Sequence, residues 1–267
     1  MFGNNSVEPL LKWAGGKRWL LPTLRRLVSG CSGTYYEPFA GGAAVFFNLQ
    51  PGKAVLSDNN EQLINCYIQV RDNPDKVVRE LSKLKNSEKQ YYAMRASQPK
   101  SNVARAARLI YLTNLSFNGI YRTNLRGEFN VPYGHRTYLP PCDPQKIYRA
   151  SKALRTTKLL HADFEKAAST AIRGDLIYFD PPYTVVHGNN GFLRYNEKIL
   201  HWTDQLRLAE LAKALKRRGC RVIVSNADNR CILELYRDFK RIRVTRQSNM
   251  AASGKSRRLT TECVFYN

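Results

Sequence analysis

The fold is decided by the stretch YYEPFAGGAAVFF, residues 35–47. Its first residues predict the end of a strand at 34–37, the small residues 40–44 predict a tight turn, and the apolar residues after them predict a helix. Glycines in such a turn let backbone amides approach a ligand where a Cβ would obstruct it. The stretch therefore indicates an α/β protein with a ligand at the end of its first strand, although an ordinary strand-to-helix turn has the same pattern.

Apolar runs and amphipathic helical stretches alternate on both sides of this turn, as they do in an α/β sheet with crossover helices. The predicted strands are 34–37, 53–57, 158–161, 175–179, 221–225, 241–245 and 262–266. Leu208, Leu211, Ala212 and Leu215 have the spacing of one helix face and predict a helix that opens near Thr203 and ends at Gly219.

The middle of the chain breaks the alternation. Helical stretches near 61–70, 74–84, 87–97 and 102–115 follow one another without a strand, and a segment rich in Gly and Asn at 118–136 then predicts one hairpin or loop. We therefore expect an α/β domain formed by residues 1–59 and 146–267, with a mainly helical domain inserted at 60–145.

The charge of the chain favours a polyanionic partner. Lys and Arg number 43 against 21 Asp and Glu, a net charge of +22. Residues 100–160 and 237–258 carry most of the excess, which predicts two basic surfaces for nucleic acid. Arg246, Lys255, Arg257 and Arg258 are candidates for phosphate contacts, unless they belong to a solvated loop.

Several other classes are excluded by composition. No window approaches the roughly 18 consecutive apolar residues of a membrane span, and residues 1–6 lack the pattern of a signal peptide, so we expect a cytoplasmic protein without a membrane partner. The six cysteines form no Cys-x-x-Cys pair and only four histidines are present, so we expect neither a disulfide framework nor a metal site.

A second motif, DLIYFDPPY at residues 175–183, ends a buried strand in an acid, two prolines and an aromatic. The prolines fix the backbone and remove N–H donors, which leaves carbonyl groups as acceptors. Asp180 and the Pro181 carbonyl could hold the two hydrogens of an exocyclic amino group while Tyr183 stacks on its flat ring. A rigid surface turn is the alternative interpretation of these residues.

Asp58 follows the strand at 53–57, about 20 residues after the glycine turn. A carboxylate at this place could bind a ribose hydroxyl pair, and it could equally cap the helix that begins near Glu61.

Five stretches of the chain occur in the order seen in one family of enzymes. They are LKWAGGK (11–17), EPFAGG (37–42), SDNN (57–60), NGIYRTNLRGEFNVPYG (118–134) and DPPY (180–183). The chain thereby resembles the Dam-like DNA adenine-N6 methyltransferases, the α-group of the D12 class, from about residue 10 to its end, including VSNAD at 224–228. It differs in Ala43, where a third glycine is usual, in Phe117, often Tyr, and in His135-Arg136.

The resemblance implies a Rossmann-like methyltransferase sheet that binds S-adenosyl-L-methionine. The residues it assigns to the cofactor are Trp13, Lys17, Phe39, Gly41, Asp58 (ribose), Asp163 and Phe164 (adenine), and Asp180 between cofactor and base. The catalytic residues it implies are Asp180, Pro181 and Tyr183. Taken alone, Trp13 could be a core or surface aromatic and Lys17 a solvated charge.

Double-stranded DNA is the partner that the resemblance implies. The DNA contacts it assigns lie at Phe117, Asn118, Ile120, Arg122, Asn124, Pro132 and Arg136. Arg122 is expected to bond O6 and N7 of a guanine, and Ile120 and Pro132 could meet a thymine methyl group. Arg126 could be structural. The site implied is GATC, whose adenine would have to be flipped out of the duplex.

Direct methyl transfer to N6 would need no metal and no covalent enzyme intermediate. We expect a monomer without an obligate protein partner, acting in a bacterial or phage-infected cell. Alternatives are a methyltransferase for RNA adenine or cytosine amino groups, a dinucleotide oxidoreductase, which would leave the DPPY turn and the charge unexplained, and a DNA-binding protein without catalysis.

Overall fold

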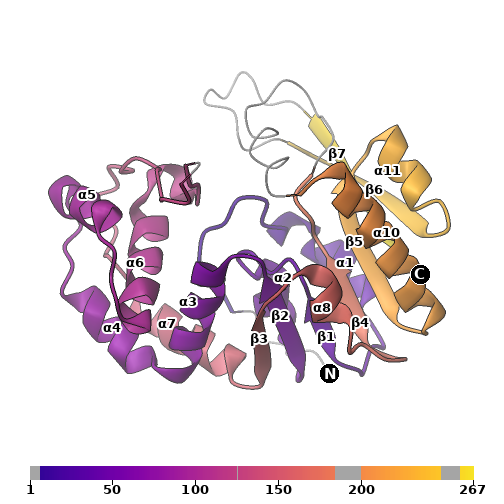
Figure 1. Cartoon of the computed structure of the whole chain (residues 1–267), viewed down its shortest axis with the longest axis horizontal. Helices are drawn as coiled ribbons and strands as arrows, with labels where there is room; N and C mark the ends of the chain where they lie inside the picture. Colours follow the sequence, from indigo (N-terminus) through magenta and orange to yellow (C-terminus); the bar gives the residue numbers. More distant parts are fainter. Residues whose placement is uncertain (1–6, 125, 184–199, 248–258) are drawn as a thin grey trace. The chain divides into compact units, whose positions relative to one another are not determined.

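The computed structural model describes residues 7–124, 126–183, 200–247 and 259–267 (Figure 1). Its strands form a seven-stranded sheet in the order β3-β2-β1-β4-β5-β7-β6. The strands are β1 Tyr35–Glu37, β2 Ala54–Asp58, β3 Thr157–His161, β4 Leu176–Phe179, β5 Arg221–Ala227, β6 Lys240–Gln247 and β7 Leu259–Tyr266. The α/β class and all seven predicted strands are confirmed, with the ends shifted by at most three residues.

The sheet is mixed. β2 pairs with β3, β1 with β4 and β4 with β5, all parallel, whereas β7 pairs antiparallel with both β5 and β6. Every residue of β4 is buried, and so are six of the seven residues of β5, from Val222 onward. Such continuous burial is typical of strands covered on both faces, and it explains why their apolar runs stand out in the sequence.

Two compact units make up the chain. The first contains Met1–Leu21 and Ala40–Asp163, and the second contains Pro22–Phe39 and Phe164–Asn267. β2 and β3 belong to the first unit, and β1, β4, β5, β6 and β7 to the second. The two units are defined by contacts within each of them and not by the course of the chain. The predicted insertion at 60–145 therefore stays a prediction.

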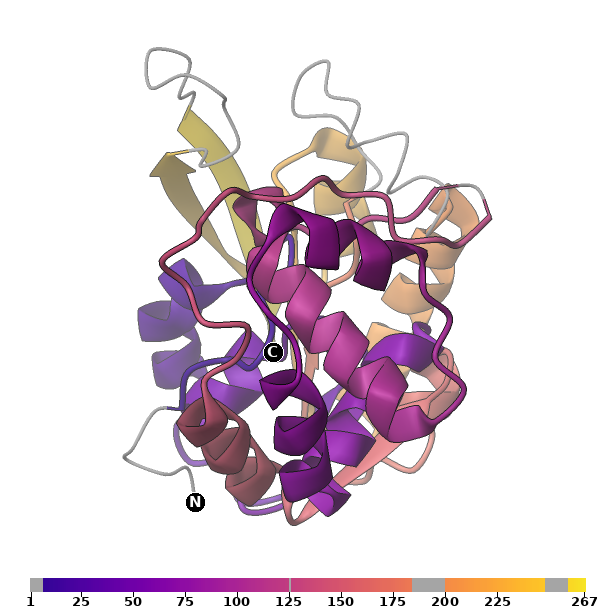
Figure 2. The ribbon, with the colours of Figure 1, turned by 90° about the vertical axis from the view of Figure 1, so that its left-hand side faces the viewer.

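Helices are the main secondary structure of the first unit. They are η1 Arg18–Leu20, α2 Ala44–Leu49, α3 Glu61–Asp72, α4 Pro74–Ser82, α5 Glu88–Ala96, α6 Asn102–Leu115, η2 Phe117–Gly119 and α7 Pro144–Leu154. The four predicted helices between 61 and 115 are confirmed, and side chains of Asn60, Ser87 and Ser101 cap α3, α5 and α6. α6 contacts α3, α4 and α5 and runs through the middle of this group, magenta in Figure 2.

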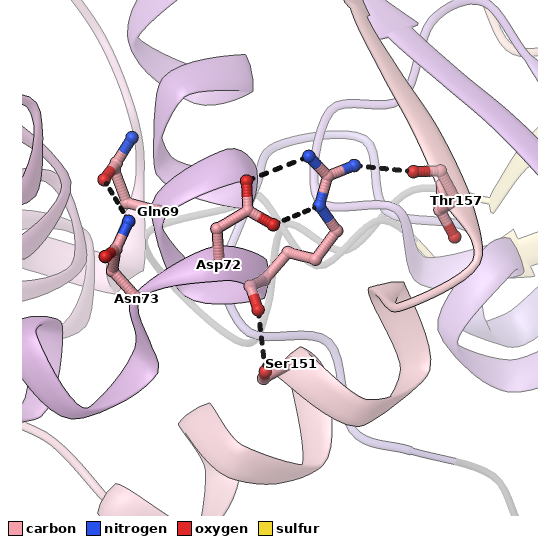
Figure 3. Close-up of polar contacts among 6 residues, drawn as sticks. Gln69, Asp72, Asn73, Ser151 and Thr157 are labelled. Carbon is pink, nitrogen blue, oxygen red and sulfur yellow. Dashed lines mark hydrogen bonds and ion pairs between the residues drawn. The ribbon is translucent and has the colours of Figure 1, made fainter.

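Arg71 ties three elements of the first unit together (Figure 3). Its guanidinium donates to both carboxylate oxygens of Asp72, at 2.7 and 3.0 Å, and to the carbonyl of Thr157 at the start of β3, at 2.8 Å. The Ser151 hydroxyl of α7 donates to the Arg71 carbonyl at 3.2 Å. The end of α3 is thereby attached to α7 and β3, and the adjacent Asn73 side chain bonds Gln69 at 3.1 Å.

The second unit carries α1 Leu21–Leu27, which begins at the unit boundary, and α8 Phe164–Ala168, α10 Trp202–Arg217 and α11 Arg230–Leu235. α10 starts one residue before the predicted opening because His201 and Asp204 form a capping box. Gly219, at φ +87°, follows its end. None of the helices described is both long and apolar enough to cross a membrane.

Candidate active site

The glycine turn of the first unit is shaped by Trp13. Gly41 has φ +46°, and a Cβ added there would lie 2.9 Å from Cδ1 of Trp13. A Cβ at Gly42 would lie 2.9 Å from Cβ of Trp13. Only glycine fits both positions without displacing half-buried Trp13. Ala43 adopts φ +49°, so the residue that replaces the family's third glycine keeps the left-handed conformation of the turn.

Asp58 holds this turn against the end of β2. One carboxylate oxygen accepts a hydrogen bond from the Gly41 amide at 2.9 Å, and the other accepts from the Asn60 amide at 3.0 Å. The Tyr67 hydroxyl donates to the Gly41 carbonyl at 2.6 Å. Burial raises the pKa of Asp58, although the backbone amides of Gly41 and Asn60 oppose the rise. The N-cap interpretation of Asp58 is wrong, because Asn60 caps α3.

Lys17 is almost fully buried, with 5% of its surface exposed, so the interpretation as a solvated charge is wrong. Its ammonium group donates to the carbonyl of Gly15 at 3.0 Å. Burial of a lysine is tolerated where the charge meets oxygen acceptors. Lys17 therefore belongs to the folded LKWAGGK stretch rather than to the surface.

The two residues expected near the cofactor's adenine, Asp163 and Phe164, differ in exposure and in the unit to which they belong. Asp163 is exposed at the end of the first unit, whereas Phe164 is buried in the second. The Phe164 ring stacks on Phe39 with 5.3 Å between centroids, and the Arg207 guanidinium lies 4.9 Å from its centre. Since only 4% of Phe164 is exposed, its ring already has partners, and Phe39 is the more accessible of the two aromatics.

The turn after β4 in the second unit is held by a polar network. Tyr183 donates its hydroxyl hydrogen to Glu262 of β7 at 2.6 Å, and Gln205 of α10 donates to the Pro182 carbonyl at 3.3 Å. The Gln205 carbonyl oxygen in turn accepts from Asn226 of β5 at 3.0 Å. Gln205, Asn226 and Glu262 are all buried, so each bond to the half-buried turn has a buried partner that is shielded from water.

Charge and burial keep Tyr183 protonated. Burial raises its pKa well above the usual value for tyrosine, and the carboxylates of Asp180 and Glu262 raise it further. The hydroxyl therefore stays a donor to Glu262 at neutral pH. The ring of Tyr183 is half-buried, and Asp180 beside it is half-buried as well.

Sequence reasoning missed Glu262 and Gln205, and it assigned no role to Asn226. The available signal for Glu262 was a single charge in the apolar closing strand 262–266. Gln205 carried no signal, because a glutamine in an amphipathic helix is ordinary. Only the packing of α10 and β7 around the turn reveals these partners.

We call the segment 117–134 the recognition segment. Its described residues form η2 and a loop, with two isolated bridges, between Ser116 and Tyr133 and between Thr123 and Phe129. Its exposed tip includes Arg122, whose Nε donates to the Asn130 side chain at 2.8 Å. Asn124 accepts from the amides of Arg126 and Glu128 and therefore shapes the turn itself.

The other residues assigned to DNA lie along the same segment. Phe117 is 53% exposed, Asn118 has φ +54° and Pro132 is exposed, whereas Ile120 is half-buried. Arg136 is different, because one terminal nitrogen of its guanidinium donates to the carbonyls of Asn114 and Ser116, at 2.7 and 3.1 Å. Arg136 thus anchors the segment to the end of α6. Arg246, Lys255, Arg257 and Arg258 have side chains outside the described part of the structure.

Comparison with known proteins agrees with these motifs. Residues 13–250 match the family model described as D12 class N6 adenine-specific DNA methyltransferase. A type II methyltransferase of Lactococcus lactis subsp. cremoris is 38% identical, over 98% of this chain and 96% of that protein. A type II methyltransferase of Methanocaldococcus jannaschii is 34% identical, over 94% of this chain and 96% of that protein.

A DNA adenine methylase of Escherichia coli K12 is 32% identical, over 94% of this chain and 92% of that protein. Among solved structures, precorrin-6y C5,15-methyltransferase of Geobacter metallireducens covers 99% of this chain and 91% of its own, at 10% identity and a TM-score of 0.37, which is too low to support an inference. On the family model and the full-length relatives, the chain belongs to the D12 class of N6 adenine-specific DNA methyltransferases.

Proposed function

We propose that this protein transfers the methyl group of S-adenosyl-L-methionine to N6 of an adenine in duplex DNA, within GATC or a related short site. The observation that carries the proposal is the Asp180–Tyr183 turn, which a buried network of Glu262, Gln205 and Asn226 holds in place. A fixed acceptor turn beside an aromatic ring suits an amino group on a flat base.

The residues of the first unit fit the cofactor. Gly41 and Gly42 are half-buried, and Trp13 packs against them in the space that a Cβ would need, so the backbone of the turn and the indole lie together. A carboxylate has about four lone-pair sites, so Asp58 can accept from ribose hydroxyls as well as from the two amides it already bonds. In this proposal Trp13, Lys17, Gly41 and Asp58 hold the cofactor, together with Phe39, Asp163 and Phe164.

The Asp180–Tyr183 turn prepares the base. Asp180 and the Pro181 carbonyl accept hydrogen bonds from the two N6 hydrogens of adenine, while Tyr183 stacks on the ring. These bonds draw charge onto the nitrogen and leave its lone pair for attack. When bound, the cofactor supplies an electrophilic methyl group on a sulfonium ion. In this proposal Asp180 also takes the proton that N6 loses afterwards. Positioning and electrostatics supply the acceleration, without a metal.

The substrate is duplex DNA, so the adenine must leave the base stack, at a cost of a few kcal/mol. Phosphate contacts from the basic surfaces offset this cost. Arg122 reads a guanine, and Phe117, Asn118, Ile120, Asn124 and Pro132 contribute to the contact along the recognition segment. We propose that a monomer does this in the cytoplasm of a bacterial or phage-infected cell, since one chain carries both the recognition and the catalytic motifs.

The test incubates the protein with methyl-labelled S-adenosyl-L-methionine and unmethylated duplex DNA. Digestion to nucleosides identifies the labelled base, and mapping of modified positions gives the site. We expect N6-methyladenine at one short sequence. Asp180→Ala should lower transfer by at least about 10²- to 10³-fold, because the acceptor for the amino group is lost, while binding of the duplex stays near that of wild type.

Other results would point elsewhere. Label in RNA or in cytosine, and none in DNA adenine, would assign the same turn to a different amino group. Duplex binding without any cofactor binding would identify a protein that recognises DNA and does not catalyse. Near-normal turnover by Asp180→Ala would remove Asp180 from the reaction and contradict the mechanism.

A further inference from the structure

Trp13 lies between the glycine turn and the recognition segment. On one side its indole and Cβ leave no room for a Cβ at Gly41 or Gly42, each of which would come within 2.9 Å. It also stacks on the Tyr121 ring, with 4.5 Å between centroids and 15° between the planes. One side chain thus contacts both the stretch we assign to the cofactor and the stretch we assign to DNA.

A second contact joins the LKWAGGK stretch, which contains Trp13, to the recognition segment. Gly119 has φ +67°, and a Cβ added there would lie 2.5 Å from Cδ of Lys12, so the recognition segment's backbone lies directly against this side chain. Tyr121 is fixed from within the segment as well, because its ring meets the buried Phe129 edge-on at 5.7 Å. The stack on Trp13 is therefore part of a packed arrangement and not a chance contact of two loose side chains.

We infer that Tyr121 couples the binding of DNA to the binding of the cofactor. This inference rests on the proposed function. DNA bound to the recognition segment holds Tyr121 in one position, Tyr121 holds the indole of Trp13, and Trp13 then supports the turn at Gly41 and Gly42. The cofactor meets a site that is already arranged and loses less freedom on binding. Tyr121 is a positioning residue in this scheme, since it acts through Trp13.

The contact limits the size of the effect. An aromatic pair of this kind corresponds to about a two- to tenfold change in a dissociation constant. Coupling between two binding sites is reciprocal, so the cofactor must strengthen DNA binding by the same factor as DNA strengthens cofactor binding. A role in folding alone would weaken both affinities and leave this factor unchanged, which makes the factor a specific readout.

Calorimetry with S-adenosylhomocysteine, which cannot react, tests the coupling on the full-length protein. The dissociation constant of S-adenosylhomocysteine is measured without DNA and with a saturating short duplex that contains GATC. The dissociation constant of the duplex is measured with and without S-adenosylhomocysteine. The coupling factor is the ratio of the dissociation constants of one ligand without and with the other. We expect the same two- to tenfold coupling factor for both ligands in wild type and in Tyr121→Phe, because both keep the ring. Tyr121→Ala should reduce the factor to about one.

Two further variants complete the design. Tyr121→Leu keeps an apolar side chain without a ring and serves if the alanine variant fails to fold; its factor should also fall to about one. Tyr148→Ala removes an exposed tyrosine of α7 that bonds Asp75, and it should keep the full factor.

An unchanged factor in both Tyr121→Ala and Tyr121→Leu, or a factor of one in wild type, would overturn the coupling. If wild type binds S-adenosylhomocysteine without coupling, only this inference fails. If wild type does not bind S-adenosylhomocysteine at all, the proposed function fails and the inference fails with it.

Discussion

Two carboxyl groups, of half-buried Asp58 and of buried Glu262, each support a turn that carries site residues. Asp58 accepts from the Gly41 amide at the glycine turn, and Glu262 accepts from Tyr183 at the turn after β4. A hydrogen bond to a charged group is worth about 1.5–3 kcal/mol, roughly twice a neutral one. At the scale of single residues, substitution of either carboxyl group therefore tests the energy of its hydrogen bonds separately from side-chain packing.

The raised pKa of Asp58 predicts a pH dependence of cofactor binding. As the pH falls from neutral toward the ordinary aspartate value of 3.8, Asp58 takes up its proton earlier than an exposed aspartate would. It then loses its charge and an acceptor site, so the dissociation constant for S-adenosylhomocysteine should rise. Asp58→Asn should weaken binding about tenfold at pH 7 and remove this pH dependence.

Calorimetry between pH 7.5 and pH 4.5 checks the Asp58 prediction, with circular dichroism at each pH as a control that the protein remains folded. A wild-type affinity that stays flat over this range, or an Asp58→Asn variant that still follows the pH, would contradict the role we assign to the carboxylate.

Glu262 should act on catalysis through Tyr183. Glu262→Ala removes the acceptor of the Tyr183 hydroxyl and should lower kcat/KM for DNA about tenfold, because the ring loses its fixed orientation. Glu262→Gln keeps a side-chain oxygen and should recover most of this loss. Steady-state methylation measures both effects.

Tyr183→Phe separates the ring from its hydroxyl. The ring that stacks on the base remains but loses the same hydrogen bond to Glu262, so kcat/KM for DNA should fall about as far as in Glu262→Ala. The buried Glu262 carboxylate loses a donor, and the free energy of unfolding in urea should fall by about 1–3 kcal/mol. Full activity in Glu262→Ala would show that the contact is not needed to position Tyr183.

At the scale of elements, hydrophobic periodicity predicted the helices, whereas the composition of the loop did not predict its hydrogen bonds. The helices α3, α5 and α6 were predictable because an apolar face and a capping side chain are both local in the sequence, and α4 because Pro74 opens it at its first position. The recognition segment offered only Gly and Asn as signals of a loop or hairpin. The bonds that Asn124 accepts from the amides of Arg126 and Glu128, and the bond from Arg136 to the Asn114 carbonyl of α6, depend on how the loop folds.

Within the recognition segment, Arg122→Ala should relax the sequence preference at one base pair. Asn130 holds the Nε of Arg122 at 2.8 Å, which orients a guanidinium whose terminal nitrogens can bond a guanine. Loss of that pair should cost about 1–3 kcal/mol of discrimination. The measurement compares methylation rates on duplexes that differ only at the guanine positions.

Arg126→Ala is the matched control for Arg122, because Arg126 is an exposed arginine of the same loop. It should leave the preference unchanged. An unaltered site preference in Arg122→Ala would remove this residue from sequence reading and move the search to its neighbours.

At the scale of the whole molecule, the net charge of +22 predicts a strong salt dependence. A protein that neutralises six to ten phosphates loses about 10³- to 10⁵-fold in affinity between 50 and 200 mM salt. We expect duplexes with and without the methylation site to lose affinity in parallel, because phosphate contacts do not read sequence. Fluorescence anisotropy at several salt concentrations measures both slopes, and a flat response would exclude phosphate contacts as the main source of affinity.

The sequence alone determined the α/β class, the seven strands, the helices between 61 and 115, and the family, because hydrophobic periodicity and contiguous motifs are local properties of a chain. Only the tertiary structure decided that Asp58 holds the glycine turn rather than capping α3, that Lys17 is buried, and that Glu262 accepts from Tyr183. The stack of Trp13 on Tyr121, more than 100 residues apart, likewise required it. The physical reason is that hydrogen bonds and ring contacts between distant residues depend on register and packing, which no local pattern encodes.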